Sequence, residues 1–192
     1  MAAYGRWAGE IVGQVSADPV MVVGHSLGAA VALAAKPGPQ ISGLVLVSPA
    51  GLSRACLTPA LFGVTLPWLA ALTAGRSQAL LRYMSGQTRG MAGADHMLAE
   101  WMTLVARHSR TSLAPLPLPE PIVRRWAGTS VVVATRAEDR FYPPARIDRP
   151  ARTLLDADVV TVPGPGHLGP HEGPALLPAL LGRLRPSKGT AR

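Results

Sequence analysis

The distribution of apolar residues predicts alternating strands and helices in the first quarter of the chain. Residues 20–24 (VMVVG) and 43–49 (GLVLVSP) are short, continuous apolar runs, which are typical of strands buried on both faces. Between them, the alanine-rich stretch SLGAAVALAAK predicts a helix that ends before Pro37 and Gly38. A strand, a helix and a second strand in this order predict a parallel pair joined by a right-handed crossover.

The last third of the chain continues this alternation. Residues 129–135 and 159–164 are two further apolar runs, and a helical segment around 144–156 separates them. Helices are also expected at both ends, over 4–16, where Tyr4, Trp7, Ile11, Val12 and Val15 recur near helical spacing, and over 170–185. The predicted fold class is therefore α/β, a parallel sheet flanked by helices.

The middle of the chain has a different character. Residues 52–125 are rich in Leu, Ala, Met and Trp in a helical pattern, and they end in the proline-rich stretch LAPLPLPEP. We interpret this segment as a helical insertion between two α/β halves of a single domain, residues 1–185. Residues 186–192 are expected to form a flexible tail.

Composition excludes several classes of protein. The net charge is +8, but 17 of the 19 basic residues are arginines spread along the chain without interleaved aromatic residues, so we expect no nucleic-acid partner. The uncharged stretch 57–74 has the length of a membrane span, yet its prolines and glycine favour a buried or cap helix pair. The N-terminus has no signal-peptide pattern, and Cys56 is the only cysteine. We therefore expect a cytoplasmic protein without a membrane partner.

Candidate chemistry first appears where the strand 20–24 meets the following helix. Residues 24–28 read GHSLG, and a G-x-S-x-G sequence between a strand and a helix forms a tight turn that presents the serine above the sheet. We expect Gly24 and Gly28 to be required because a side chain at either position would collide with its surroundings. The N-terminus of the helix points at Ser26, so the N–H of Leu27 is a candidate donor to a developing oxyanion.

A serine hydroxyl needs a base to take its proton and a carboxylate to orient that base. Glu138 and Asp139 come just after the strand 129–135, and His167 follows the strand 159–164 in a Gly/Pro loop. Because parallel strands end at the same edge of a sheet, these groups are expected to lie near Ser26. His171 lies close to His167 in the chain and is an alternative base.

Three motifs in this order resemble the α/β-hydrolase family with a helical cap. VVGHSLGAAVAL is similar to the nucleophile elbow of that family, EDRFYPP to its acid turn and VPGPGHLGPHE to its histidine loop. The resemblance implies that Ser26 is the nucleophile, Asp139 the orienting acid and His167 the general base. It places Glu138 one position too early and His171 at the start of the last helix, while His25 fills the variable position of the elbow and is expected to pack near the site.

The resemblance also implies the class of reaction. We expect a serine hydrolase that cleaves a carboxylic ester or related acyl bond through an acyl-enzyme. The apolar residues of 52–125 indicate a small, apolar or acyl substrate. The two histidines of that segment, His96 and His108, do not share a helix face with a carboxylate at metal-ligand spacing, so we expect no metal and no cofactor. The stretch VSPAGLSR is mildly similar to C–C bond hydrolases, and thioesterases share the same triad.

Strands that precede the elbow in the family are missing from this sequence. The four predicted strands match the fifth to the eighth of the family, and the earlier strands carry the second oxyanion donor. The strand 20–24 would then be an open apolar edge, which natural proteins avoid. We expect either a longer protein whose N-terminal half covers this edge, or a truncated, weakly active binding module that needs a partner or an oligomer to cover it.

Overall fold

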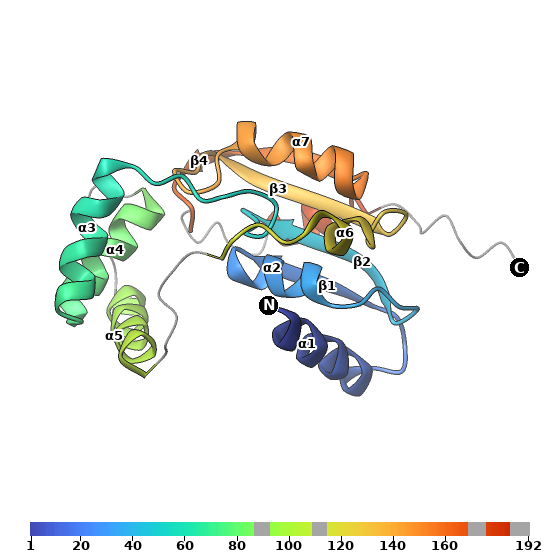
Figure 1. Ribbon diagram of the computed structural model, residues 1–192, viewed down its shortest axis with the longest axis horizontal. Helices are drawn as coiled ribbons and strands as arrows, with labels where there is room; N and C mark the ends of the chain where they lie inside the picture. The colour runs from blue at the N-terminus through green and yellow to red at the C-terminus, as the bar shows by residue number, and fades with distance from the viewer. Residues whose placement is uncertain (87–92, 109–114, 169–175, 185–192) are drawn as a thin grey trace, which may run out of the picture.

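Four parallel strands form the centre of the molecule (Figure 1). The computed structural model describes residues 1–86, 93–108, 115–168 and 176–184. The strands lie side by side in chain order, β1-β2-β3-β4, and every neighbouring pair is parallel. They are β1 (Val20–His25), β2 (Ile41–Val47), β3 (Ser130–Glu138) and β4 (Asp158–Pro165).

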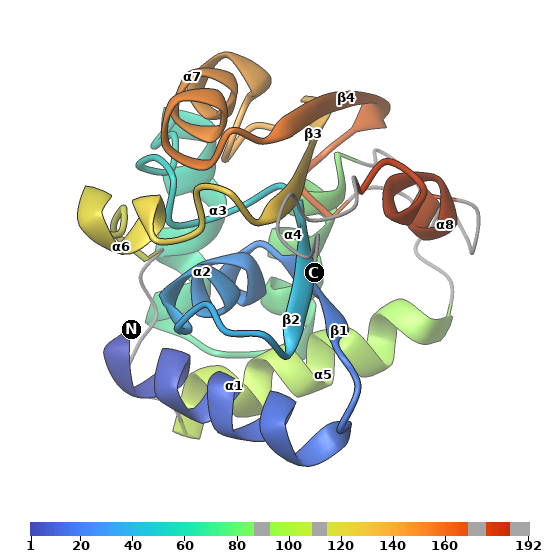
Figure 2. The same ribbon diagram turned by 90° about the vertical axis from the view of Figure 1, so that its right-hand side faces the viewer.

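Helices cover both faces of this sheet. Figure 2 shows α2, α6 and α7 on one side and α8 on the other, with α1 packed against α2. The helices around the sheet are α1 (Ala2–Val15), α2 (Leu27–Ala34), α6 (Glu120–Arg124), α7 (Pro144–Leu155) and α8 (Leu176–Leu181). The predicted α/β class, a parallel sheet flanked by helices, is confirmed.

The main hydrophobic core lies between the sheet and α2, α6 and α7. Leu33, Leu46 and Ile147 are completely buried there, together with Trp126, whose Nε1 donates a hydrogen bond to the Leu33 carbonyl at 2.9 Å. A smaller cluster on the opposite face includes Val45, Val132, Ala134 and Leu180 of α8. Burial on both faces explains why the middle strands are apolar at consecutive positions.

Three further helices lie beyond one end of the sheet (Figure 1). They are α3 (Pro59–Ala70), α4 (Ala74–Ser85) and α5 (Gly93–His108), and all three fall within the predicted helical segment 52–125. A buried chain of hydrogen bonds links them: Trp68 Nε1 donates to Ser77 Oγ at 2.9 Å, and that oxygen lies 2.7 Å from Thr103 Oγ1. We call α3, α4 and α5 the helical layer.

Several predicted boundaries differ from the observed ones. The strand β2 ends at Val47, two residues early, because Ser48 has a φ of +44°, outside the strand region. The strand β3 continues to Glu138, so this residue belongs to the strand rather than to the turn after it. Of the closing helix expected over 170–185, the structure has Leu176–Leu181, while 169–175 and the predicted tail 186–192 lie outside the described residues.

The strand β1 is at the edge of the described sheet and pairs only with β2. Its predicted burial on both faces is wrong for Met21 and Val23, whose exposed fractions are 49% and 46%, because no described residue covers that face at the end of the sheet. In the described sheet, β1 is thus the open apolar edge that the sequence predicts. On α1, the apolar side chains Tyr4 and Trp7 are also exposed. Among the described residues, no helix has the length and apolar composition that crossing a membrane requires.

Candidate active site

Ser26 occupies a single strained position between β1, which ends at His25, and α2, which begins at Leu27. Its φ of +51° and ψ of −114° lie outside the regions that side-chain-bearing residues favour. Two backbone bonds to the segment around the end of β2 hold it there: Ser26 N donates to the Val47 carbonyl at 3.0 Å, and Ala50 N donates to the Ser26 carbonyl at 3.1 Å. Strain of this kind persists only where the surroundings fix it, as they do here.

The two glycines of the elbow have different surroundings. A Cβ atom on Gly24 would lie 2.7 Å from the Cα and N of Ala29, so the close approach of β1 and α2 requires glycine there. A Cβ atom on Gly28 would meet no atom within 4 Å. The predicted steric need at Gly28 is therefore wrong for this structure, because Gly28 is exposed on the first turn of α2 and nothing described packs against it.

The three predicted triad residues form one chain of hydrogen bonds. Ser26 Oγ lies 2.7 Å from His167 Nε2, and His167 Nδ1 lies 2.9 Å from Asp139 Oδ2. The three side chains come from the carboxyl ends of β1, β3 and β4, which meet at one edge of the sheet. Asp139 and His167 are each only 2% exposed. Asp139 and His167 thus lie near Ser26, as expected from their places after β3 and β4.

Asp139 is held as a carboxylate. Its Oδ1 accepts hydrogen bonds from Phe141 N at 2.8 Å and Tyr142 N at 2.9 Å, which leaves Oδ2 for His167. Burial alone raises the pKa of Asp139, but the hydrogen bond and charge of His167 and the Tyr142 N–H outweigh burial, so the pKa lies below its ordinary value. An ionised Asp139 requires Nδ1 of His167 to carry a proton, so Nε2 is free to accept one from Ser26.

His25 lies beside His167, as expected for the variable position of the elbow. Its Nε2 donates a hydrogen bond to the His167 carbonyl at 3.1 Å, and the two ring centroids are 5.2 Å apart. Desolvation lowers the pKa of His25, and the nearby His167 lowers it further. His25 therefore favours the neutral form and braces the loop that carries His167.

The alternative site residues lie elsewhere. Glu138 is an exposed residue at the end of β3, and it is Asp139 that accepts the hydrogen bond from His167 Nδ1. His171 lies outside the described residues. On α5, His96 is exposed and lies 3.7 Å from Glu100, and His108 is exposed at the end of the helix. Among the residues that the structure describes, no group of three or more His, Cys, Asp or Glu residues is arranged to hold a metal ion.

The family of the chain follows from a match over most of its length. The family model described as "Alpha/beta hydrolase family" matches residues 2–178. The chain belongs to the alpha/beta hydrolase family. No curated protein matches it.

Solved structures of this family share the fold at low identity. Naproxen esterase (carboxylesterase NP) from Bacillus subtilis has a TM-score of 0.71 at 15% identity, over 94% of this chain and 64% of its own. Carboxylesterase CesB from the same organism has a TM-score of 0.64 at 15% identity, over 87% and 60%. The 2-hydroxy-6-oxo-6-phenylhexa-2,4-dienoate hydrolase of Rhodococcus sp. strain RHA1 has a TM-score of 0.60 at 17% identity, over 78% and 58%. This alpha/beta hydrolase chain thus spans less than two thirds of the length of each.

In this alpha/beta hydrolase chain, an apolar pocket borders Leu27, the residue that follows Ser26. Leu27 is the first residue of α2, so its N–H has no acceptor within the helix. Its role as an oxyanion donor stays a prediction. The exposed Leu27 side chain borders a pocket of about 590 Å³ whose other walls are Met1, Tyr4, Val31 and the segment 115–119.

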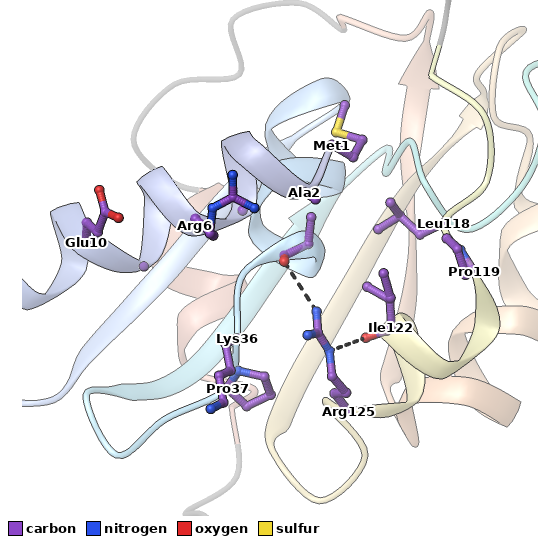
Figure 3. A pocket seen from close by; sticks show the side chains of 13 residues that line it. Met1, Ala2, Arg6, Glu10, Lys36, Pro37, Leu118, Pro119, Ile122 and Arg125 are labelled. Atoms are coloured by element: carbon purple, nitrogen blue, oxygen red, sulfur yellow. Dashed lines mark hydrogen bonds between the residues drawn. The ribbon is translucent and has the colours of Figure 1, made fainter.

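A second pocket lies away from the triad, between α1, the end of α2 and α6 (Figure 3). Its volume is about 830 Å³, and none of Ser26, Asp139 and His167 lines it. Arg125 at its wall already donates hydrogen bonds to the carbonyls of Ile122 and Ala34, at 3.2 and 3.3 Å. This pocket is therefore separate from the hydrogen-bonded chain of Ser26, His167 and Asp139.

Sequence reasoning missed the groups that hold the triad in place. The N–H groups of Phe141 and Tyr142 lie within the recognised acid turn, so the spacing of that turn was a signal for them. The Met84 carbonyl, which accepts a hydrogen bond from His167 N at 2.6 Å, had no signal in the sequence.

Proposed function

We propose that this protein is a serine hydrolase that cleaves a carboxylic ester or related acyl bond through an acyl-enzyme. The observation that carries the proposal is the 2.7 Å contact between Ser26 Oγ and His167 Nε2 at a strained strand-to-helix turn. A hydroxyl is a poor nucleophile by itself, and a base at this distance is the arrangement that activates it. Membership of the alpha/beta hydrolase family supports the same conclusion.

The reaction follows the positions of the protons. His167 Nε2 takes the hydroxyl proton of Ser26 as Oγ forms a bond to the substrate carbonyl carbon, and the carbonyl oxygen becomes an oxyanion beside the Leu27 N–H. When this intermediate collapses, the bond to the leaving alcohol breaks and His167 gives its proton to the alcohol oxygen. Water then attacks the acyl-Ser26 ester and gives a proton to His167. A second collapse releases the acid and returns the proton to Ser26 Oγ.

The substrate proposed for this site is small and either apolar or acyl. On the helical layer and the loop before it, Leu57, Phe62 and Leu66 are exposed, whereas Leu61 and Trp68 are buried among the helices. Exposed apolar side chains on a layer close to the elbow favour an acyl chain over a charged group. Two solved structures of the same fold are carboxylesterases, which agrees with an ester substrate.

A second candidate is a weakly active hydrolase-like module that acts through binding. The observation that favours it is the open edge of β1, where Met21 and Val23 are about half exposed. The loss of one oxyanion donor lowers the rate by about 10²–10³-fold, so a form with Leu27 as its sole donor would turn over slowly. The two candidates differ in turnover, while both retain the Ser26 nucleophile.

A fluorophosphonate probe tests the nucleophile directly. We expect the probe to label Ser26 in the folded, full-length protein, and Ser26→Ala to abolish labelling while the thermal melt remains cooperative. Ser53→Ala is the matched control, because Ser53 lies outside the triad and its Oγ donates a hydrogen bond to the Arg54 carbonyl at 3.4 Å. Labelling that persists in Ser26→Ala would refute the assignment. Turnover of a panel of p-nitrophenyl esters and matched thioesters then separates the two candidates.

A further inference from the structure

The last turn of α4 is bonded to the loop that carries His167. Both His167 N and Leu168 N donate hydrogen bonds to the Met84 carbonyl, at 2.6 and 3.2 Å. Met84 is one residue from the end of α4, where helix carbonyls have no donor within the helix. The backbone of the histidine loop therefore supplies the donors that this helix end lacks.

Two glycines bring the backbones into direct contact. Gly86, which ends α4 with a φ of +69°, lies against Gly166, which precedes His167 with a φ of +72°. A Cβ atom on Gly166 would lie 2.1 Å from the carbonyl carbon of Ser85 and 2.5 Å from Gly86 N. Both the left-handed conformation and the absence of a side chain are thus required at Gly166. The residue next to His167 has no room to shift toward the helix.

The same turn of α4 also reaches the acid loop. The Tyr83 ring packs edge-on against Phe141 with centroids 5.8 Å apart, and the Phe141 ring is 5.2 Å from that of His167. The Tyr83 hydroxyl lies 2.9 Å from Thr58 Oγ1, at the start of α3. The helical layer is therefore connected to both loops that hold His167 and Asp139.

We propose that the last turn of α4 positions the general base, and that Gly166 is the positioning residue through which it acts. This inference rests on the proposed function, in which His167 is that base. The hydrogen bonds to the Met84 carbonyl fix the position of the His167 backbone along the end of α4. The contact between Gly86 and Gly166 fixes the distance of this backbone from α4. A displacement of the helical layer would therefore move His167 Nε2 away from Ser26 Oγ. The position of the helical layer and the hydrogen bond between Ser26 and His167 are thus coupled.

Gly166→Ala tests the positioning role. The new Cβ atom must move from 2.1 Å to at least 3.0 Å from the Ser85 carbonyl carbon, which displaces the loop by roughly 0.9 Å. A misplacement of about 1 Å costs on the order of 10²-fold in rate. We expect the Ser26 labelling rate and kcat for p-nitrophenyl butyrate to fall by about that factor. KM should change little, because the substituted residue lies behind the base rather than against the substrate.

Gly128→Ala is the matched control for backbone strain. Gly128 also has a positive φ, +91°, but a Cβ atom there would meet nothing within 4 Å. We expect Gly128→Ala to keep the wild-type labelling rate even if its melting temperature falls. An equal loss of labelling in a folded Gly128→Ala would overturn the inference, because strain alone would then explain the effect.

Gly86→Ala provides a second test if Gly166→Ala does not fold. A Cβ atom on Gly86 would lie 2.8 Å from Gly166 N and from the Pro165 Cβ, so it pushes the same loop by a smaller amount. The labelling rate of Gly86→Ala should fall below that of the wild type, by less than the factor of about 10² expected for Gly166→Ala. A folded Gly86→Ala or Gly166→Ala that labels at the wild-type rate would refute the inference. Absence of Ser26 labelling in the wild type would instead refute the proposed function.

Discussion

Replacing Asp139 with asparagine should leave the fold intact and disable the base. In the wild type, Oδ1 accepts the Phe141 and Tyr142 N–H groups and Oδ2 faces His167 Nδ1 at 2.9 Å. An asparagine that keeps its oxygen toward the two N–H groups turns its NH₂ toward His167. Nδ1 must then be the acceptor, so the proton of the neutral ring moves to Nε2. A protonated Nε2 cannot take the hydroxyl proton of Ser26.

The size of the effect follows from this wrong tautomer. In a Ser-His-Asp triad, the same substitution lowers kcat by about 10⁴-fold while the geometry is retained. Because each factor of ten corresponds to about 1.4 kcal/mol, the barrier should rise by roughly 5 kcal/mol. The substituted carbonyl keeps both backbone bonds, so the free energy of unfolding should change much less than the barrier.

Steady-state hydrolysis of p-nitrophenyl butyrate, with a thermal melt of each variant, provides the assay. Glu138→Gln is the control: this neighbouring carboxylate is exposed at the end of β3, so its loss should leave kcat nearly unchanged. The reasoning fails if a folded Asp139→Asn retains more than about a tenth of wild-type kcat. It fails equally if Glu138→Gln is the variant that loses activity, because Glu138 would then be the acid.

Two further predictions concern the edge strand and the histidine beside the base. We expect the 192-residue chain alone to self-associate and to turn over esters poorly, because β1 leaves unpaired backbone groups beside the half-exposed Met21 and Val23. The double variant Met21→Lys/Val23→Lys should therefore elute later than the wild type in size-exclusion chromatography. An active, monodisperse wild-type monomer would contradict this prediction. The pKa of His25 is lowered in the folded state from its ordinary value of 6.5. Below pH 6.5 the unfolded chain therefore binds more protons than the folded chain, and the free energy of unfolding decreases as the pH falls through that value. The drop in melting temperature between about pH 7.5 and about pH 5.5 should therefore be smaller in His25→Gln, and an equal drop would show that His25 does not contribute.

Motifs with a fixed local geometry could be predicted from the sequence. The GHSLG stretch determines the turn at Ser26 because glycine, serine and the helix start are adjacent in the chain. Asp139 and His167 follow apolar strands, so the parallel sheet brings them to one edge without further information. In these cases the physical cause lies within a few residues of the motif.

Features that depend on neighbours distant in the chain were not predictable. The contact of Gly86 with Gly166 joins two loops 80 positions apart, and neither glycine differs in the sequence from an ordinary turn residue. The open surroundings of Gly28 and the exposure of Val23 depend on what lies beside β1, which the apolar pattern does not encode. The pattern of apolar residues predicts that a surface is apolar, but it does not predict which part of the chain packs against that surface.

The order of the strands has a consequence for how the molecule is made. Each of the strands β2, β3 and β4 pairs with the described strand that precedes it in the sequence, so the growing chain can add each of them at the edge formed by the one before. Domains generally begin to fold from the N-terminal side during synthesis. Ser26 is synthesised before His167, which follows it by 141 residues and comes after β4. The hydrogen bond between Ser26 and His167 can therefore form only after β4 has been synthesised.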